Sequence, residues 1–370
     1  MEVTKLAGKF AYKKFADINL ADSFFDSLKA DYPGTETSTE FCTWFNKKAS
    51  SGTKALVYED ETGVGAFVYI KEENESINLV DADSLPALDR IKLGTMKISD
   101  LHRGQRIGEG AIGLALWNWQ RSKKNEIYVT VFPKHETLIL LLTRFGFVLA
   151  GTNSNGEKVY IKSRLSNCYD NPYVSFPFVN PNFREAGYLI FEDIYHDTMF
   201  PFSELKNVTQ KSVELSVANG LSKIYVSAAP QINYNVGDPV LIYRKYNGSG
   251  AKVYKSCLTS FCMITNIIQV KKWGQALISF DDLMSRIGNK SVFDQNELRK
   301  KYDNDWNVIV FELLYYAFFG AGNNINCAWL KENNLWSKDG GYPTNTKLSP
   351  DEFRLILKEG NLDVQNIIID

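Results

Sequence analysis

The residues of this sequence whose types and spacing could do chemistry form a short glycine-containing stretch, Arg103-Gly104-Gln105-Arg106-Ile107-Gly108-Glu109-Gly110. It follows a strand-like segment, Arg90–Ser99, and leads into the apolar helical pattern of Ala111–Trp119. A loop at such a junction points several backbone N–H groups the same way, and the helix N-terminus adds partial positive charge. The stretch therefore predicts a diphosphate site, and a turn selected only for tight packing is the alternative.

The elements that must position this loop alternate along the first half of the chain. The patterns predict strand, helix, helix, three strands, helix, strand, helix and two strands. In chain order the segments are Phe10–Ile18, a helix through Phe24, Phe25 and Leu28, a helix over Ser38–Lys48, Ala55–Glu59, Val64–Ile70, Arg90–Ser99, Ala111–Trp119, Glu126–Phe132, Lys134–Phe145, Phe147–Ala150 and Lys158–Lys162.

A change of pattern divides the chain. From Ser163 to Ala186 the sequence is rich in Asn, Pro, Ser and aromatic residues, which is typical of a connector. Beyond it strands dominate, and a strong helix start appears at Ser349-Pro350. We therefore expect domains over 1–163 and 187–370, joined by residues 164–186. The expected strands of the second half are Lys223–Ser227, Pro239–Tyr246, Lys252–Val270 and Asn307–Leu314, with Asn247-Gly248-Ser249-Gly250 as a hairpin turn.

The composition is that of a folded globular protein. Of 370 residues, 44% are hydrophobic and 23% charged, which excludes a disordered tail and a fibrous repeat. The 42 Lys and Arg residues balance 43 Asp and Glu residues, for a net charge of -1. This balance excludes the broad positive field of a non-specific DNA coat protein, while a local basic groove stays open.

Neither a metal cage nor a membrane helix is expected. The five cysteines include no C-x-x-C pair, which argues against zinc and against a complete disulfide framework, so they are expected to be reduced core thiols. Apolar runs such as Leu138–Leu142 fall short of the roughly 18 residues that a membrane helix needs. Charges in Met1–Phe10 stand where a signal peptide would have its apolar core. A cytoplasmic protein without a membrane partner is the expectation.

The loop also resembles a known signature. Gln105-x-x-Gly108-x-Gly110, preceded by Arg103-Gly104, is similar to the Q/R-x-x-G-x-G/A motif of the GNAT acetyltransferase superfamily, and Gly146-Phe147 resembles its later G-F. The resemblance covers about residues 8–163. It implies an α/β (α+β) fold with a mixed central sheet, N-acetyltransferase activity and acetyl-CoA as cosubstrate. The pyrophosphate would lie on the amides of Arg103–Glu109. The strands Arg90–Ser99 and Glu126–Phe132 would splay and hold the pantetheine arm like an extra strand, with an amide near Ile98 facing the acetyl carbonyl.

Two departures from the family pattern bear on the chemistry. Arg106 stands where the tightest motifs carry Gly, which is acceptable if its backbone is in an ordinary region. The usual Tyr general acid is absent, since Leu142 holds its position. His135 is then the catalytic candidate as a proton shuttle; a helix-capping or CoA-contacting His is the alternative. His102 is expected to be a surface or phosphate neighbour, and Asp100 or a water is considered as the base.

The second half resembles another group. Val236-Gly237-Asp238 followed by the strand through Tyr243 is similar to the PUA-like domains, which include the ASCH and EVE families, over about residues 187–370. This implies a small β-barrel with helices that binds RNA or a nucleobase by stacking and base-edge hydrogen bonds. The candidate contacts are Tyr225, Tyr243, Arg244 and Lys245. In the alternative, the tyrosines pack the barrel and the basic residues are solvated; alternation places Tyr243 and Lys245 on one face and Arg244 on the other.

Three functions remain open at this point. The first is acetyl transfer to an RNA-linked or nucleobase-containing amine; some proteins of this broad kind act on charged tRNA as toxins. The second is acetyl transfer to a protein or small-molecule amine, with a regulatory or interaction module as the second domain. The third is a degenerate acetyl-CoA-binding regulator, which the missing Tyr keeps open. Catalysis with some amine acceptor is the expectation.

Overall fold

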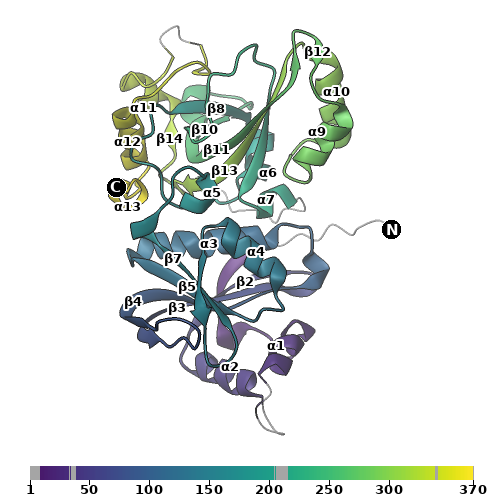
Figure 1. Cartoon of the computed structure of the whole chain (residues 1–370). Helices are drawn as coiled ribbons and strands as arrows, with labels where there is room; N and C mark the ends of the chain where they lie inside the picture. Colours follow the sequence, from purple (N-terminus) through teal and green to yellow (C-terminus); the bar gives the residue numbers. More distant parts are fainter. Residues whose placement is uncertain are drawn as a thin grey trace. The chain divides into compact units, whose positions relative to one another are not determined.

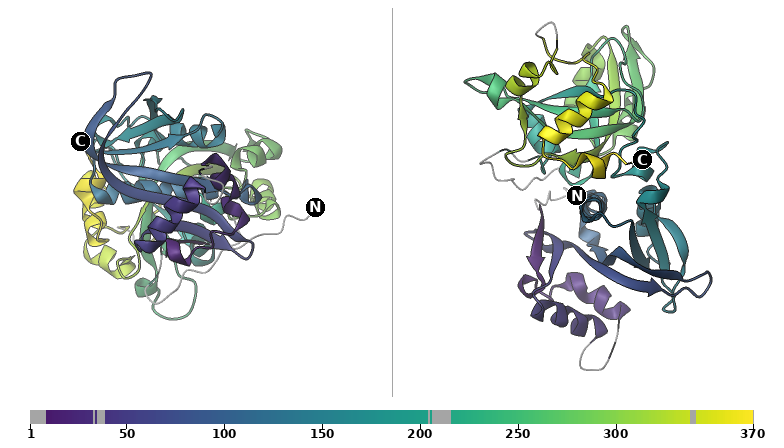
Figure 2. Two further views of the ribbon diagram at one scale, coloured as in Figure 1. Left: turned by 90° about the horizontal axis from the view of Figure 1, so that it is seen from below. Right: turned by 90° about the vertical axis from the view of Figure 1, so that its left-hand side faces the viewer.

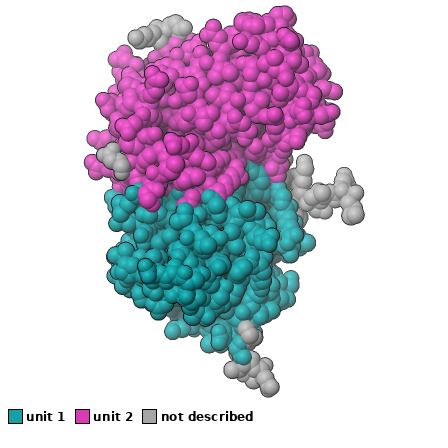
Figure 3. Space-filling model, in the orientation of Figure 1, with its two compact units in different colours: residues 1–143, 147–165, 212–215 teal, residues 144–146, 166–211, 216–370 magenta. Residues whose placement is uncertain are grey.

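A computed structural model describes residues 9–32, 34, 39–203, 205, 216–337 and 341–369. Residues 1–8, together with Ser38, the first residue of the second predicted helix, lie outside the described residues. The chain divides into two compact units, coloured separately in Figure 3. Within the described ranges, unit 1 comprises residues 9–143 and 147–165, and unit 2 comprises 144–146 and the residues from 166 onward.

Unit 1 is built on a mixed sheet in the order β1-β2-β3-β4-β5-β7-β6 (Figure 1). Only the β4–β5 pair is parallel. The element order matches the predicted alternation. The elements are β1 (Lys9–Lys14), η1 (Phe15–Asp17), η2 (Ser23–Phe25), α1 (Asp26–Asp31), α2 (Glu40–Ser50), β2 (Lys54–Asp60), β3 (Gly63–Ile77), β4 (Leu85–Ile98), η3 (Asp100–His102), α3 (Ile107–Ser122), β5 (Glu126–Val131), α4 (Glu136–Arg144), β6 (Val148–Thr152), β7 (Lys158–Ser163) and η4 (Arg164–Ser166).

Helices cover both faces of this sheet (Figures 1 and 2). On one face α1 and α2 pack a cluster of rings around Phe15, Phe25 and Phe67. The opposite face carries Tyr58 and Ala66, which pack with the first residue of α3. Because side chains alternate along β3, neighbouring residues of one strand supply both cores. The sheet is thus buried on both sides, as a mixed α/β arrangement requires.

The parallel pair β4–β5 opens before either strand ends. Its last paired residues are Leu93 and Val129, although β4 continues to Ile98. Thr95 of β4 pairs with Tyr69 of β3, and Leu93 pairs with the next residue of β3. Gly94 therefore has no partner and is an extra, bulged residue. A bulge bends its strand and increases its twist, which turns the end of β4 away from β5. The predicted splay is therefore present, with the phosphate-loop candidate at its open end.

Unit 2 has a second mixed sheet in the order β8-β10-β11-β13-β9, with β12 and β14 both paired to β11 (Figure 1). Its strand β8 is parallel to β10. The elements are α5 (Pro172–Ser175), β8 (Gly187–Glu192), α6 (Asp193–Met199), α7 (Ser216–Asn219), β9 (Ser222–Ser227), β10 (Pro239–Lys245), α8 (Lys252–Lys255), β11 (Cys257–Lys272), β12 (Gln275–Ala276), α9 (Phe280–Ile287), α10 (Gln295–Asn304), β13 (Val308–Phe318), β14 (Ile325–Asn326), α11 (Cys327–Glu332), α12 (Pro350–Glu359) and α13 (Val364–Ile367).

The fold class expected from the sequence, mixed sheets with helices, is confirmed. Ser349 caps α12 in a full capping box with Glu352, as its sequence predicts. Three details were wrong. Phe15–Asp17 forms a 3-10 turn rather than the end of the strand predicted over Phe10–Ile18. Lys252–Lys255 forms a helical turn rather than the start of the strand, and Cys168 is exposed rather than in a core. No helix in the part of the chain that the structure describes has the length and apolarity to cross a membrane.

Candidate functional site

The predicted phosphate loop begins with a turn that uses its own amides. The N–H groups of His102, Arg103 and Gln105 donate to the carbonyls of Ser99 (3.0 Å), Asp100 (3.2 Å) and His102 (3.2 Å). From Ile107 onward the geometry changes, because the first amides of a helix have no partner within it. The amides of Ile107 and Gly108 make no hydrogen bond among the described residues. The helix end, rather than the preceding turn, is therefore the part of Arg103–Glu109 that offers N–H groups.

Arg106 enters α3 through a left-handed backbone conformation, with φ of 60°. The sequence argument required an ordinary region, so that condition is not met. A non-glycine residue in this region costs about 1 to 2 kcal/mol. Its side chain is nearly buried and holds the carboxylate of Glu109, with Nε at 3.1 Å and Nη2 at 2.7 Å. This pair neutralises an acidic residue at the very helix end where an anion would bind.

Gly104 and Gly108 leave free space beside the loop. Gly104 has φ of 80°, and no atom lies within 4 Å of the position its Cβ would take. A Cβ at Gly108 would lie 3.4 Å from the side chain of Leu141, an ordinary contact. Gly108 is thus not required by internal packing, so the bare backbone there leaves room for a ligand to approach. Gly110 donates its N–H to Arg106 (3.2 Å) and continues the helix.

The side chain of His102 is buried beside the loop rather than lying on the surface. Its ring is buried, and Nε2 lies 2.6 Å from Oδ2 of Asp60 at the end of β2. Burial of Asp60 would raise the pKa of its carboxyl, but hydrogen bonds from Thr62 and His102 lower it overall. The predicted surface role of His102 is therefore wrong, and the ring fixes the turn that leads into α3. Asp100, the considered base, is exposed and pairs with Arg103 at 2.7 Å.

Ile98 lies at the open end of the splay. Ser99 donates its N–H to Gly65 of β3 at 2.8 Å. Successive N–H groups of a strand point to opposite edges, so the N–H of Ile98 points away from β3 and toward the side that β5 has left. The predicted contact of this amide with an acyl carbonyl agrees with that direction and stays a prediction.

His135 immediately precedes α4 and accepts the first helical hydrogen bond, from Ile139. Its side chain is 47% exposed, and Nε2 lies 3.9 Å from Oδ2 of Asp31 at the end of α1. The neighbouring Lys134 is also bonded to Asp31. His135 therefore lies beside the end of α1, with a carboxylate oxygen near its ring but beyond hydrogen-bond distance.

A buried carboxylate that the sequence did not single out lies in the same region. Glu157, in the turn before β7, is 8% exposed. One of its oxygens accepts bonds from the hydroxyls of Tyr32 and Thr130, both 3.3 Å long, and the other accepts from Asn153 at 2.9 Å. All three donors are neutral, and Glu157 has no ion pair within the described ranges. Burial, together with the charge of Glu157, raises the pKa of Tyr32 to about 12, so the phenol stays a donor.

The position of Glu157 connects it to the splay. Thr130 follows Val129, the last residue of β5 that pairs with β4. Tyr32 comes directly after α1, which covers the sheet face opposite to α3. Burial lowers the pKa of the nearby Lys92, and the charges of Glu73 and Glu157 oppose that effect, so a cation lies within electrostatic range of Glu157 without a direct bond to it. The only sequence signal of Glu157 is an acidic residue at the end of a hairpin turn, a pattern that also describes many solvated glutamates.

The aromatic candidates of unit 2 pack within the fold. Tyr243 is buried and its ring lies 4.9 Å from that of Trp336. Tyr225 lies 4.9 Å from Phe191, and burial raises the pKa of its hydroxyl to about 12. These contacts correspond to the alternative in which the tyrosines fill the core, and a base could stack on them only if these contacts were displaced.

The basic candidates of unit 2 are paired with carboxylates. Arg244 is buried and binds Asp197 through Nε and Nη2 at 2.7 and 2.8 Å. Asp197 also contacts Nδ1 of His196 (2.8 Å), whose other nitrogen meets Thr259 (2.7 Å). Lys245 pairs with Glu192 at 2.7 Å. Its side chain lies on the face of β10 opposite to that of Arg244, as alternation predicts. The four predicted residues are thus not assembled into one open site.

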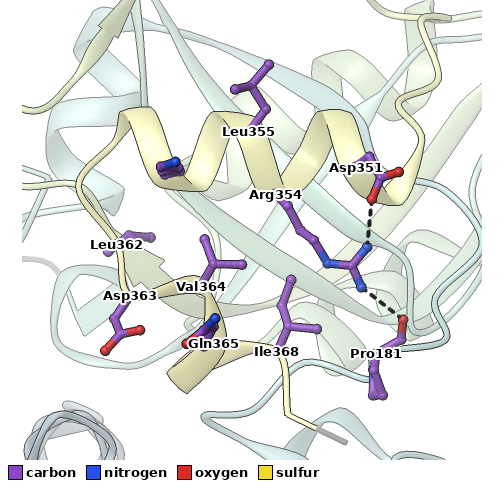
Figure 4. A pocket seen from close by; sticks show the side chains of 10 residues that line it. Pro181, Asp351, Arg354, Leu355, Leu362, Asp363, Val364, Gln365 and Ile368 are labelled. Carbon is purple, nitrogen blue, oxygen red and sulfur yellow. Dashed lines mark hydrogen bonds and ion pairs between the residues drawn. The ribbon is translucent and has the colours of Figure 1, made fainter.

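A surface groove of about 680 Å³ lies elsewhere in unit 2, between α12 and α13 (Figure 4). Arg354 extends across one side of it and contacts Asp351 at 3.2 Å and the carbonyl of Pro181 at 3.5 Å (Figure 4). Apolar side chains such as Leu355 and Val364 share the lining with acids and Lys358. None of the residues predicted from the sequence lines this groove.

Comparison with known proteins finds no match by sequence, either to a family model or to a curated protein. Solved structures similar to the chain include the PaiA N-acetyltransferase of Thermoplasma acidophilum in complex with coenzyme A, at 14% identity over 42% of this chain and 99% of that chain, with a TM-score of 0.30. Arabidopsis thaliana Naa50 with a bisubstrate analogue is 18% identical over 42% and 98%, with a TM-score of 0.28. An ASCH protein of Zymomonas mobilis is 13% identical over 48% and 96%, with a TM-score of 0.31.

Proposed function

We propose that unit 1 binds acetyl-CoA and transfers its acetyl group to a primary amine. The parting of β4 and β5 after Leu93 and Val129 carries this proposal. It leaves strand edges that can pair with the amide-bearing arm of coenzyme A, and it ends at the amides of Ile107 and Gly108, which suit the pyrophosphate. One ligand that combines an extended amide chain with a diphosphate fits both features.

The chemistry needs a proton acceptor, an oxyanion donor and a proton for the leaving thiolate. The amine attacks the thioester carbonyl, the oxygen gains negative charge, and the N–H of Ile98, which points away from β3, is proposed to stabilise it. Glu157, on the face opposite to α3, is proposed to take the proton from the attacking amine. Holding both reactants in a fixed orientation lowers the activation barrier by roughly 7 to 11 kcal/mol.

His135 is the second group proposed to move a proton. Its exposed ring beside Asp31 can exchange protons with water, which suits return of a proton to the thiolate after the carbon–sulfur bond breaks. This role replaces that of the missing Tyr, whose position Leu142 fills with a fully buried side chain.

For the acceptor, we propose an RNA-linked or nucleobase-containing amine that unit 2 recruits. The alternative is a protein or small-molecule amine, with unit 2 as a regulatory or interaction module. The buried state of Tyr243 and Arg244 means that any contact to RNA uses other residues of unit 2. Incubation with radiolabelled acetyl-CoA and a fractionated cell extract separates these acceptors: label in RNA supports the first, and label in protein or amines supports the second.

The donor half of the proposal is tested by calorimetric titration with coenzyme A. We expect saturable binding, with weaker binding of pantetheine, which lacks the pyrophosphate. Absence of heat at millimolar coenzyme A would overturn the assignment. Binding without any labelled product would instead favour the degenerate acetyl-CoA-binding regulator.

A further inference from the structure

The hairpin that joins β11 to β12 has an unusual residue at its tip. Lys272 pairs with Gln275, so the turn consists of Trp273 and Gly274, with φ of 51° and 80°. A two-residue turn with both values positive is type I′, in which Asn-Gly and Gly-Gly are preferred. A bulky aromatic residue in this backbone region is a rare outlier and carries strain. The indole of Trp273 is therefore kept at a position where its backbone is unfavourable.

The surrounding structure holds this turn in place. The N–H of Trp273 donates to Oδ1 of Asn307, a buried side chain, at 2.9 Å, and the N–H of Gly274 donates to the carbonyl of Trp306 at 2.8 Å. A Cβ on Gly274 would lie 2.9 Å from the Trp306 ring, so that ring rests against the turn. Trp273 and Trp306 thus form one preorganised feature, which we call the indole tip.

Both rings of the indole tip face solvent. Trp273 is 58% and Trp306 64% exposed. Neither indole has an aromatic or cation–π partner within the described ranges. Strained backbone that is fixed by neighbouring hydrogen bonds, and that presents large exposed side chains, is typical of a binding surface.

Uncompensated lysines lie next to the tip. Lys271 donates to the carbonyls of Tyr302 and Asp303 at 2.9 and 3.0 Å, at the C-terminal end of α10. Lys272, which directly precedes Trp273, is exposed and has no ion pair within the described ranges.

We propose that the indole tip binds single-stranded nucleic acid, with bases stacked on Trp273 and Trp306 and a phosphate near Lys272. Stacking on aromatic faces with lysines along the backbone is the general mode of such binding. The proposal does not depend on acetyl transfer, since its test measures binding alone.

The experiment measures fluorescence anisotropy of a labelled 12-nucleotide RNA of mixed sequence with the full-length protein. Trp273→Asn removes the ring and places a residue that the turn prefers, so the fold is retained. We expect this variant and Trp306→Gln each to weaken binding about tenfold. Lys272→Gln should reduce the salt dependence of log K by about one. The matched control is Tyr254→Ala, another exposed aromatic residue of unit 2, which should bind like the wild type.

Melting temperatures of all variants verify that they fold. Equal RNA affinity of the wild type and Trp273→Asn, or no RNA binding by the wild type, would overturn the proposal. Binding of the wild type to vesicles of anionic lipid but not to RNA, lost in Trp273→Asn, would also overturn it and assign the tip to a membrane surface. Because coenzyme A titration and acetyl transfer are measured separately, failure here leaves the proposed function of unit 1 intact.

Discussion

Two carboxylates, Glu157 in unit 1 and Asp197 in unit 2, are held in opposite ways. Glu157 accepts bonds only from neutral donors, two of them 3.3 Å long. Asp197 receives a bidentate guanidinium from Arg244 and a further contact from His196. Hydrogen bonds from these partners lower the pKa of Asp197 against the effect of burial. One carboxylate is bonded only to neutral donors, whereas the other is paired with a buried guanidinium.

The difference follows from where the residues lie. Glu157 is in a turn beside strands that have parted, where backbone pairing no longer fills the space. Arg244 lies on β10, which is paired on both sides, so its side chain must find its partner within the fold. A buried charge without such a partner would be costly. Reactive groups are therefore expected where regular pairing ends.

Substitution of Glu157 is expected to have the largest effect and tests this comparison most directly. Glu157→Gln removes the proton acceptor and keeps the size of the side chain, so we expect kcat/KM for acetyl transfer to fall about 100-fold, the typical effect of losing a general base. The affinity for coenzyme A and the melting temperature should change little, because the lost contacts are to neutral groups. Thiol release from acetyl-CoA measures the rate. Glu61→Gln, in the exposed turn before β3, is the control; unchanged turnover in Glu157→Gln would reject the catalytic assignment.

The matching substitution in unit 2 should affect stability instead. Asp197→Asn leaves the buried guanidinium of Arg244 without a countercharge, and we expect a loss of about 2 kcal/mol in the free energy of unfolding, reduced because the Asp197 side chain is half exposed. Coenzyme A binding should be unaffected. Urea denaturation followed by circular dichroism measures the difference, and a stability equal to the wild type would contradict the contrast.

This effect should depend on pH. The pKa of Asp197 is lower in the folded state than its unfolded value of about 3.9, so its contribution is complete above that value. It is lost as the pH falls from about 4 toward the depressed folded value. The stability gap between the wild type and Asp197→Asn should therefore be constant near neutrality and shrink in acid.

These contrasts also explain what the sequence could predict. Glycine spacing and flanking periodicity indicated the junction at Gly108, because a strand, a loop and a helix are encoded locally. The partners of Arg244 and the neighbours of Glu157 could not be found this way, since Asp197 and Tyr32 come from distant segments. The bulge at Gly94 was missed for a related reason: it is defined only by the register against β3. Local pattern predicts elements, and pairing across the fold decides which side chains remain available.

Gly108→Ala sharpens the contrast within unit 1. A methyl group here meets Leu141 at 3.4 Å and Ile98 at 3.9 Å, both ordinary contacts, and alanine suits a helix better than glycine, so stability should be equal or slightly higher. The same methyl group would stand where the pyrophosphate approaches, and we expect coenzyme A affinity to fall about tenfold. Calorimetry measures the affinity and thermal unfolding the stability. Gly156→Ala is a poor control because its φ is positive; Gly113→Ala, later in α3, is the matched one.

The ion pair between Arg106 and Glu109 in unit 1 can be compared with the Arg244 ion pair of unit 2. Its substitution is expected to change the stability less. Arg106→Gly relieves a left-handed backbone, worth about 1 kcal/mol, but removes the partner of the nearly buried Glu109, worth about 2 kcal/mol. We expect a net loss of about 1 kcal/mol in the wild type. In a Glu109→Gln background no carboxylate is left without its partner, so Arg106→Gly should leave the free energy of unfolding unchanged or increase it. Unfolding of the four proteins measures this double-mutant cycle, and the sign change separates the backbone cost of Arg106 from the ion pair that justifies it.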